Sequence, residues 1–261
     1  MSDMHYTRTG DKSPDILLLH GWASSSRMWR RILHEFDHIG RLWVPDLPGH
    51  GRTPPLPTPT HIDLLTQHVI RFCDQHHIQP QVIIAHSMGG LITLKLVHTR
   101  PDLAQQLVLI CPVVTGEYGF GVSSVISTPA GSALLRQTES LWGLLRNDTL
   151  LRFAPIQGAP DIAEAMRQDW KDTDARTAIE TLVSMPKSDM MPFLTDIAHP
   201  TLVMVGSNDL TVPPSEGQTA ALYMPNAQLV TFSQAMHRPF DEQPQDFMPT
   251  LRAFLIRHGI I

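Results

Sequence analysis

Short apolar runs alternate along this chain with longer stretches in which apolar residues recur every three or four positions. The apolar runs are residues 16–19, 42–44, 82–85, 107–110, 201–205 and 228–232. Continuous runs of this length, rich in Val, Ile and Leu, are typical of strands buried on both faces of a sheet. The helical spacing covers residues 26–36, 60–77, a stretch that begins after Ser87, and 244–257. Residues 4–10 predict a further short strand at an edge of the sheet.

Strands that alternate with helices predict a mostly parallel sheet covered by helices on both faces. From about residue 112 to residue 192 the chain has turn-forming residues and amphipathic helical pieces, but no convincing strand. We therefore predict a single α/β domain whose core is formed by residues 1–111 and 193–261, with a helical cap, residues 112–192, inserted between two strands. Ligands of such sheets bind in the loops at the carboxyl ends of the strands.

Composition narrows the classes of function. A net charge of −5 argues against a nucleic-acid-binding protein, which usually carries a basic surface. No apolar run approaches the length of a membrane span, and the first residues lack the basic and apolar regions of a signal peptide. We therefore expect a soluble cytoplasmic protein. Its two cysteines, Cys73 and Cys111, lie in apolar stretches, where buried free thiols are expected.

The chain contains 14 histidines, which raises the question of a metal site. They are scattered, and neither H-E-x-x-H nor C-x-x-C spacing occurs. We treat most of them as solvated or core side chains and predict no metal ion.

Ser87 lies where an apolar run gives way to a helical pattern, in the sequence Ala85-His86-Ser87-Met88-Gly89. A serine on a sharp strand-to-helix turn brings the backbone on either side close together, so its neighbours at positions 85 and 89 must be small. The usual pattern is G-x-S-x-G, and Ala85 replaces the first glycine. The alternative is an ordinary serine that caps the following helix. We predict that Ser87 is a nucleophile.

A serine hydroxyl needs a base, and the base needs an orienting acid. Asp209 directly follows the predicted strand at 201–205, and His237 follows the strand at 228–232 after a short loop. The alternatives are a turn-forming aspartate and a loop histidine. Since Ser87 also ends a strand, and the order Ser, Asp, His matches this kind of fold, we predict that Ser87, Asp209 and His237 form a catalytic triad.

Two other aspartates compete for the role of the acid. Asp46 also follows a strand, but it lies in Asp46-Leu47-Pro48-Gly49-His50-Gly51, where turn chemistry is the better interpretation. Asp241 follows His237 too closely to orient its ring. A carboxylate nucleophile, as a dehalogenase or epoxide hydrolase of this architecture requires, is excluded by Ser87 at the turn.

Two backbone N–H groups are needed to stabilise the oxyanion of an acyl-transfer reaction. We predict that Met88, next to the nucleophile, supplies one. The loop after the first long strand, His20-Gly21-Trp22, should supply the other through the N–H of Trp22. The side chains of Trp22 and Met88 would then flank the acyl group, with plain loop packing as the alternative for Trp22.

Several motifs together resemble the α/β-hydrolase superfamily over nearly the whole chain outside the cap. They are His20-Gly21-Trp22, Asp46-Leu47-Pro48-Gly49-His50-Gly51, His86-Ser87-Met88-Gly89-Gly90, Gly206-Ser207-Asn208-Asp209 and His237. The resemblance implies an α/β-hydrolase fold with a helical cap and a serine hydrolase activity that needs no metal or organic cofactor.

Within that superfamily the chain is similar to the esterases of biotin synthesis that cleave the methyl ester of pimeloyl-acyl-carrier protein. The similarity rests on Trp29 after His20-Gly21-Trp22, on His237-Arg238-Pro239-Phe240, and on Arg152-Phe153-Ala154-Pro155-Ile156-Gln157 in the cap. It implies that Phe153 and Gln157 line a substrate channel and that Arg152 contacts an acidic carrier protein.

The cap arginines fit such a partner, but they also fit a solvated surface. Arg136, Arg146, Arg152, Arg167 and Arg176 either form a basic face for an acidic carrier protein or are interspersed with the acidic residues of the cap. We leave both interpretations open.

We therefore expect a serine carboxylesterase that acts through an acyl-enzyme, with the methyl ester of pimeloyl-acyl-carrier protein as substrate. One alternative is a general short-chain carboxylesterase or a carbon–carbon bond hydrolase with the same triad. Another is a non-catalytic ligand receptor on this fold. We expect no nucleic-acid or membrane partner.

Overall fold

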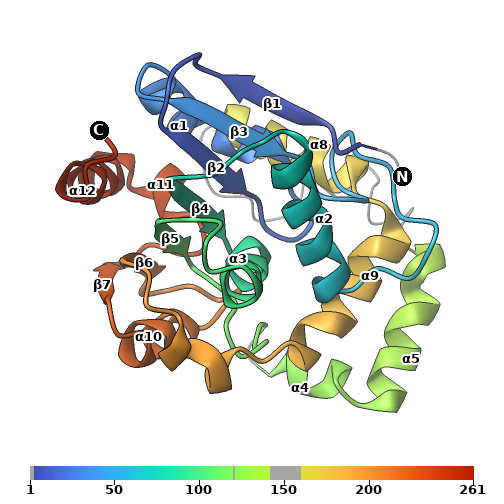
Figure 1. Cartoon of the computed structure of the whole chain (residues 1–261). Helices are drawn as coiled ribbons and strands as arrows, with labels where there is room; N and C mark the ends of the chain where they lie inside the picture. The colour runs from blue at the N-terminus through green and yellow to red at the C-terminus, as the bar shows by residue number, and fades with distance from the viewer. Residues whose placement is uncertain (1–2, 120, 142–159) are drawn as a thin grey trace.

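A computed structural model describes residues 3–119, 121–141 and 160–261 of the protein. At its centre lies a seven-stranded sheet (Figure 1). In chain order the strands are β1 (Tyr6–Thr9), β2 (Asp15–Leu19), β3 (Arg41–Pro45), β4 (Val82–His86), β5 (Gln106–Ile110), β6 (Thr201–Gly206) and β7 (Ala227–Phe232). These elements confirm the predicted strands, with every boundary within two residues of the expected one.

The strand order in the sheet is β1-β3-β2-β4-β5-β6-β7. β1 runs antiparallel to β3, and every other neighbouring pair is parallel. The order changes direction between β2 and β4, since the chain runs outward from β2 to β3 and then returns to the other side of β2. A crevice at the carboxyl ends of the strands is expected at such a point.

The sheet has an apolar layer on each face, and the side chains of each strand alternate between the two. In β4, Ile83 and Ala85 pack into one layer, and Val82 and Ile84 into the other. The first layer is completed by α2 (Ile62–Gln75), α3 (Met88–Thr99) and α10 (Pro214–Tyr223). The second is completed by the 3-10 helix η1 (Ser26–Trp29), α1 (Arg30–Phe36), α11 (Pro239–Glu242) and α12 (Pro244–Arg257).

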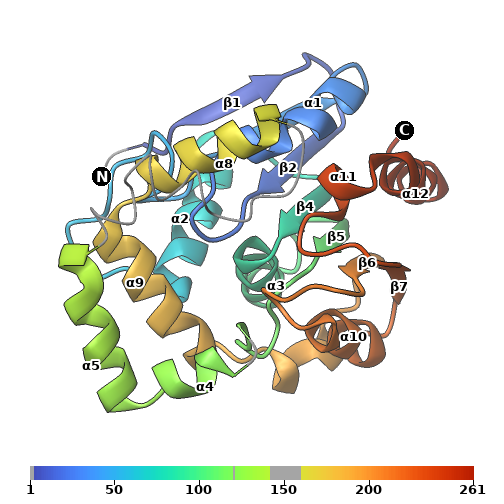
Figure 2. The same cartoon turned by 180° about the vertical axis from the view of Figure 1, so that it is seen from behind.

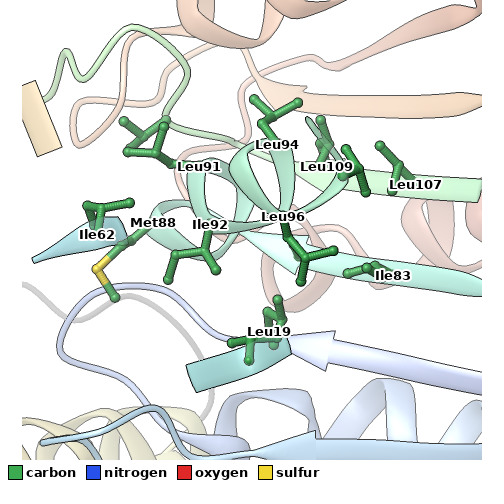
Figure 3. Close-up of a cluster of buried hydrophobic side chains, with 14 of the residues drawn as sticks. Leu19, Ile62, Ile83, Met88, Leu91, Ile92, Leu94, Leu96, Leu107 and Leu109 are labelled. Carbon is green, nitrogen blue, oxygen red and sulfur yellow. The ribbon is translucent and has the colours of Figure 1, made fainter. Parts of the chain in front are cut away.

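Helix α3 is buried on nearly all sides, which fixes the position of its first residue. The close-up in Figure 3 shows its side chains packed among residues of the neighbouring strands: Leu19, Ile83, Leu107 and Leu109. Leu91, Ile92, Leu94 and Leu96 of α3 are all fully buried. Burying a leucine or isoleucine side chain contributes about 1.5–3 kcal/mol, so α3 is a rigid support for whatever precedes it.

The helix predicted at residues 26–36 is two helices. A 3-10 turn, η1, begins after Ser25, whose hydroxyl accepts a hydrogen bond from the N–H of Arg27, and α1 continues from Arg30. Short 3-10 turns are frequent at helix starts, and apolar spacing alone does not distinguish them from α-helix. The other predicted core helices are present as α2, α3 and α12.

The segment between β5 and β6 is helical in the part that the structure describes. It contains α4 (Val122–Ile126), α5 (Pro129–Gln137), η2 (Thr138–Leu141), α8 (Pro160–Asp172), α9 (Ala175–Ser184), η3 (Met185–Lys187) and η4 (Met191–Asp196). None of its described residues belongs to a strand. Both views place α4, α5 and α9 together, away from α12, whereas α8 lies apart from α4 and α5, on the side of β1 and α1 (Figures 1 and 2).

Two further findings bear on the composition-based expectations. Cys73 and Cys111 are both free and buried, as predicted, in the two opposite apolar layers. Within the described ranges, every helix is too short or too polar to cross a bilayer.

Candidate active site

Ser87 occupies the sharp turn between β4 and α3. Its backbone has φ 55° and ψ −120°, a conformation that costs a non-glycine residue about 1–3 kcal/mol. Backbone hydrogen bonds hold it there: its N–H donates to Ile110, and its carbonyl accepts from Gly90 and Val113. Its side chain makes no capping bond to α3, so the alternative of an ordinary helix cap is wrong. The hydroxyl is therefore not used by the helix that follows it.

Close backbone contacts explain the small residues around Ser87. A Cβ at Gly89 would lie 2.4 Å from the carbonyl oxygen of Leu19, and one at Gly21 would lie 3.0 Å from the Cβ of Ser87. Position 85 is different, because Ala85 continues the strand and pairs with Leu19 in β2. An alanine in place of the usual first glycine therefore causes no strain here.

Asp209 and His237 are in direct contact, although 28 positions separate them in the chain. Nδ1 of His237 lies 2.6 Å from Oδ2 of Asp209, whose side chain is 2% exposed. The other oxygen, Oδ1, accepts the backbone N–H groups of Thr211 and Val212 at 2.8 and 3.0 Å. Asp209 thus forms the turn proposed as the alternative interpretation and also binds the imidazole. The turn holds the carboxylate in place, and the carboxylate accepts a hydrogen bond from Nδ1 of His237. Nδ1 is therefore the ring nitrogen that carries the proton in the neutral imidazole.

His86, the residue before Ser87, brings the His237 loop to the elbow. Its Nε2–H donates to the backbone carbonyl of His237 at 2.8 Å, and the two rings lie 4.5 Å apart between centroids. Burial, followed by the proximity of His237, lowers the pKa of His86 well below its ordinary value. A neutral His86 therefore adds no positive charge beside His237.

Glu242 in α11 holds the backbone on both sides of His237. Its carboxylate accepts the N–H of Met236 at 2.5 Å and the N–H of Arg238 at 3.0 Å. Neither His86 nor Glu242 was identified from the sequence. The available signal for His86 was its position next to the candidate nucleophile, whereas no pattern distinguishes Glu242 from the other glutamates of the chain.

These contacts bring three strand ends together. Ser87 follows β4, Asp209 follows β6 and His237 follows β7, all at the carboxyl edge of the parallel sheet. The contacts of His86 and Asp209 with His237 link all three positions. Ser87 also lies beside the end of β2, at the point where the strand order changes direction.

Met88 directly follows Ser87 in the chain, and Trp22 follows Gly21, which lies against Ser87. Met88 is the first residue of α3, and its side chain is fully buried in the apolar layer with Ile62 and Ile92 (Figure 3). The indole N–H of Trp22 donates to the carbonyl of Ala178 in α9 at 2.9 Å. The oxyanion roles of these two backbone N–H groups therefore remain predictions, while the side chains of Met88 and Trp22 pack into the core and against α9.

The two rival aspartates serve other purposes. Asp46 accepts the N–H groups of Ser26 and Arg52. Burial opposes its ionisation, but the interaction with His20 and these backbone hydrogen bonds together lower the pKa of Asp46. Asp241 pairs with two arginines: Nε of Arg31 lies 3.2 Å away and Nη2 of Arg238 lies 2.6 Å away. Neither carboxylate contacts the imidazole of His237 through any bond of the described residues.

A third group, the thiol of Cys111, adjoins the histidine–aspartate pair. Ligand atoms of Cys111, Asp209 and His237 lie within 4.8 Å of one another, a spacing that a metal ion can bridge. Burial raises the pKa of Cys111 well above its ordinary value, and the charge of Asp209 adds to the effect. A protonated thiol is a poor ligand, and Nδ1 of His237 is already bonded to Asp209, so the set is better suited to proton handling than to metal binding.

The predicted cap residues fall into two groups. Arg152, Phe153 and Gln157, together with Arg146, lie outside the described residues. Of the remaining cap arginines, Arg167 pairs with Glu164 at 2.7 Å and Arg176 donates to the carbonyl of Leu56. These two arginines are thus partnered within the protein.

The chain resembles known proteins of one fold family. The model of one family, the alpha/beta hydrolase fold, matches residues 14–244. Among curated proteins, the chain is 27% identical over 260 residues to the pimeloyl-acyl-carrier-protein methyl ester esterase of Nitrosomonas europaea, covering 95% of this chain and 98% of that one. It is also 27% identical to the protein of the same name from Chromobacterium violaceum, covering 96% and 97% of the two chains.

Two solved structures with similar folds are named as an esterase and a hydrolase. An esterase from Exiguobacterium antarcticum superposes with a TM-score of 0.81 at 17% identity, covering 97% of this chain and 95% of that one. A hydrolase from Pseudomonas aeruginosa PA01 gives a TM-score of 0.79 at 23% identity, with 96% and 93% covered. At these identities the likeness concerns the fold.

Proposed function

The chain belongs to the alpha/beta hydrolase fold family, and from that premise we propose that it is a serine carboxylesterase with Ser87, His237 and Asp209 as its catalytic triad. One observation carries the proposal. Nδ1 of His237 lies 2.6 Å from an oxygen of the buried Asp209. The backbone carbonyl of His237 accepts a hydrogen bond from His86, the residue next to Ser87, whose backbone is strained. Backbone strain at Ser87, whose hydroxyl caps no helix, supports a chemical role for that hydroxyl.

The first half of the reaction forms an acyl-enzyme. Because Nδ1 of His237 is bonded to Asp209, Nε2 is the nitrogen that accepts the Ser87 proton. The Ser87 Oγ attacks the ester carbonyl, and the carbonyl electron pair moves onto its oxygen. When the tetrahedral intermediate collapses, the bond to the alkoxy oxygen breaks, and His237 gives that oxygen the proton it took. An alcohol leaves, and the acyl group stays on Ser87.

The second half repeats the same steps with water. His237 removes a proton from water as the water oxygen attacks the acyl carbonyl, and then returns a proton to Ser87 Oγ as that oxygen leaves. The products are the free acid and the original enzyme. Asp209 stabilises the imidazolium in both halves without itself being protonated. The steps use only groups of this chain, so we propose that the reaction requires no metal or organic cofactor.

Backbone N–H groups of Met88 and Trp22 are proposed to bind the developing oxyanion. Met88 is the first residue of a 12-residue helix, so its N–H has no partner within the helix and lies at the positive end of the helix dipole. Trp22 follows Gly21, whose position lies against Ser87. Removing one such donor typically reduces kcat about 10²–10³-fold.

For the substrate, we propose the methyl ester of a pimeloyl group carried on an acyl-carrier protein. Support comes from the names of the full-length relatives at 27% identity. In this proposal residues 112–192 form a cap over a core of residues 1–111 and 193–261, Phe153 and Gln157 line the acyl channel, and Arg152 contacts the carrier protein. Methanol and the carrier-bound free acid would be the products.

A direct assay with the carrier-bound methyl ester tests this function. The protein should release methanol, and Ser87→Ala should reduce kcat by about 10³-fold or more. Thr250→Val, which removes a hydroxyl from the surface of α12, is the matched control and should leave turnover unchanged. In cells, the wild-type gene but not Ser87→Ala should rescue a biotin-requiring strain that lacks its own methyl esterase.

The same assay separates the alternatives by substrate class. Faster turnover of short p-nitrophenyl esters than of the carrier-bound ester would favour a general carboxylesterase. Cleavage of ring-cleavage diketones would favour a carbon–carbon bond hydrolase. No turnover of any of the three, with tight ligand binding retained in Ser87→Ala, would favour a receptor and reject the proposal.

A further inference from the structure

The loop after β2, residues 20–27, is bound on one side by the core. It contains Trp22, and it is tied to the turn after β3 by two hydrogen bonds. Nε2 of His20 accepts the N–H of Leu47 at 2.9 Å, and Oδ1 of Asp46 accepts the N–H of Ser26 at 2.7 Å. The central part of the loop, residues 21–25, lies between these two anchors.

Asp169 of α8 binds that central part from the other side. Its carboxylate is 2% exposed and accepts hydrogen bonds from the hydroxyl of Ser25 at 2.5 Å and of Ser24 at 3.2 Å. Nη1 of Arg27 lies 2.6 Å from the same carboxylate, and Asp172, one helical turn later, pairs with Nη2 of Arg27. Three polar contacts, from Ser24, Ser25 and Arg27, therefore connect the loop to one buried side chain more than 140 positions away.

The same helices also contact Trp22. Its indole N–H donates to the carbonyl of Ala178, and its ring meets that of Trp170 edge-on, with centroids 5.4 Å apart. Trp170 is the neighbour of Asp169 in α8. Two sets of contacts therefore connect Trp22 to α8. One is made by the ring of Trp22 with Trp170, and the other by Ser24 and Ser25 with Asp169.

A carboxylate at position 169 is better suited to orienting the loop of residues 20–27 than to attaching α8 to that loop. An ionised carboxylate removed from water is costly unless it is fully hydrogen-bonded, and apolar residues of similar volume would attach a helix at least as firmly. Burial opposes the charge of Arg27, but its hydrogen bonds to Asp169 and Asp172 outweigh this and raise the pKa of Arg27. What the carboxylate adds is direction, since each of its oxygens accepts at a defined angle.

We propose that Asp169 is a positioning residue for the oxyanion donor: it holds Ser24, Ser25 and Arg27 so that the N–H of Trp22 points at the scissile carbonyl. The inference rests on the proposed esterase function. It makes the segment between β5 and β6 part of the catalytic machinery, because a helix of that segment sets the geometry of a loop that belongs to the sheet. Loss of Asp169 then weakens transition-state binding and leaves ground-state binding of the ester intact.

The test compares Asp169→Ala, Ser25→Ala and the double variant on one ester. Asp169→Ala should lower kcat about 10–100-fold with KM within about threefold, because an oxyanion donor acts mainly in the transition state. Ser25→Ala removes the hydroxyl that makes the shortest hydrogen bond to Asp169, and it should also lower kcat. The double variant should be less impaired than the product of the two single effects. Asp169→Asn, which retains one acceptor oxygen, should recover part of the loss.

Glu164→Ala is the matched control, because it removes a carboxylate from the exposed side of α8 and should leave kcat unchanged. Melting temperatures are measured for each variant. Inactivation of Ser87 by a fluorophosphonate gives a second readout, which should slow in Asp169→Ala in parallel with kcat and still reach one label per chain.

A wild-type kcat in Asp169→Ala or Ser25→Ala would overturn the inference, as would a loss that Glu164→Ala shares. Exactly additive effects in the double variant would overturn it as well. If Asp169→Ala does not fold, Ser25→Ala alone decides. Failure of the proposed function looks different: the wild-type protein itself would hydrolyse no ester and take no label at Ser87.

Discussion

Two aspartates follow two strands of the same sheet and have different roles. Asp46 comes after β3 and Asp209 after β6, and both carboxylates are almost fully buried. Both also accept backbone N–H groups: Asp46 from Ser26 and Arg52, Asp209 from Thr211 and Val212. The difference lies in the second oxygen. In Asp46 this oxygen accepts the N–H of Arg52 and also lies 3.2 Å from Nδ1 of His5, whereas in Asp209 it holds no backbone group of the described residues and contacts Nδ1 of His237 at 2.6 Å.

The comparison shows that a strand-end aspartate is not an acid of the site by position alone. Asp46 uses both oxygens to hold backbone, so it organises the turn and the loop beside it. Asp209 needs only Oδ1 for its turn, which leaves Oδ2 free to orient the imidazole. One carboxylate can therefore stabilise a loop and serve the chemistry at the same time, provided the two tasks fall on different oxygens.

The largest expected effect is that of Asp209→Asn. Oδ1 can still accept from Thr211 and Val212, but an amide NH₂ facing His237 favours the wrong imidazole tautomer. We expect kcat to fall by about 10³–10⁴-fold while the melting temperature changes little. Steady-state kinetics and thermal unfolding of the same sample check this. A variant that loses stability but keeps its turnover would remove the distinction between the two aspartates.

Asp46→Ala should show the opposite pattern. It leaves the N–H groups of Ser26 and Arg52 without their acceptor, and each unsatisfied buried group costs about 1–3 kcal/mol. We expect the free energy of unfolding to fall by about 3 kcal/mol in urea titrations. Turnover per folded molecule should stay within about tenfold of wild type. A catalytic loss as large as that of Asp209→Asn would mean that Asp46 takes part in the chemistry.

Glu242→Ala tests whether the His237 loop needs its own support. The variant removes the acceptor of the Met236 and Arg238 N–H groups and leaves the contact with Asp209 in place. We expect kcat to fall about tenfold with KM nearly unchanged, since misplacing the base affects the transition state. Glu139→Ala, in η2 and remote from this loop in the chain, is the control. Equal kinetics in the two variants would contradict a positioning role for Glu242.

The turn of Asp46 also predicts the response to acid. Burial lowers the pKa of His50 to about 3, so this histidine becomes protonated in the folded state only at a much lower pH than in the unfolded state. The stabilisation is complete above the unfolded pKa of about 6.5 and is lost as the pH falls toward about 3. Between about pH 5.5 and 4, His50→Gln should reduce the slope of unfolding free energy against pH by about 1.4 kcal/mol per unit. Thr250→Val, at the surface of α12, should keep the wild-type slope.

The sequence predicted most of the sheet because burial on two faces leaves a strong pattern. The runs at 82–85 and 107–110 mark β4 and β5 closely, since strands of this kind contain few polar residues. The division of residues 26–36 into a 3-10 turn and an α-helix left no such pattern. It depends on the hydroxyl of Ser25, which caps η1 and also bonds to a helix far along the chain.

For the candidate site, the sequence indicated residues for the proposed triad but not the residues that hold them in place. Asp209 and His237 were identified from their places at strand ends, and the contact between them is present. The contacts of His86, Glu242 and Asp169 were not predicted, because each is made with backbone or loop groups that only the folded chain brings within reach. The roles assigned to Phe153 and Gln157 remain predictions, as these residues lie outside the described ranges.

The most direct test of the central claim is to trap the covalent intermediate. Wild-type protein is mixed with an activated ester, quenched in acid during the first turnover and analysed as intact mass and as peptides. We expect one acyl group per chain, attached to the peptide that contains Ser87, and none in Ser87→Ala. Rapid turnover with no acyl group on Ser87, or with the acyl group on another residue, would contradict it.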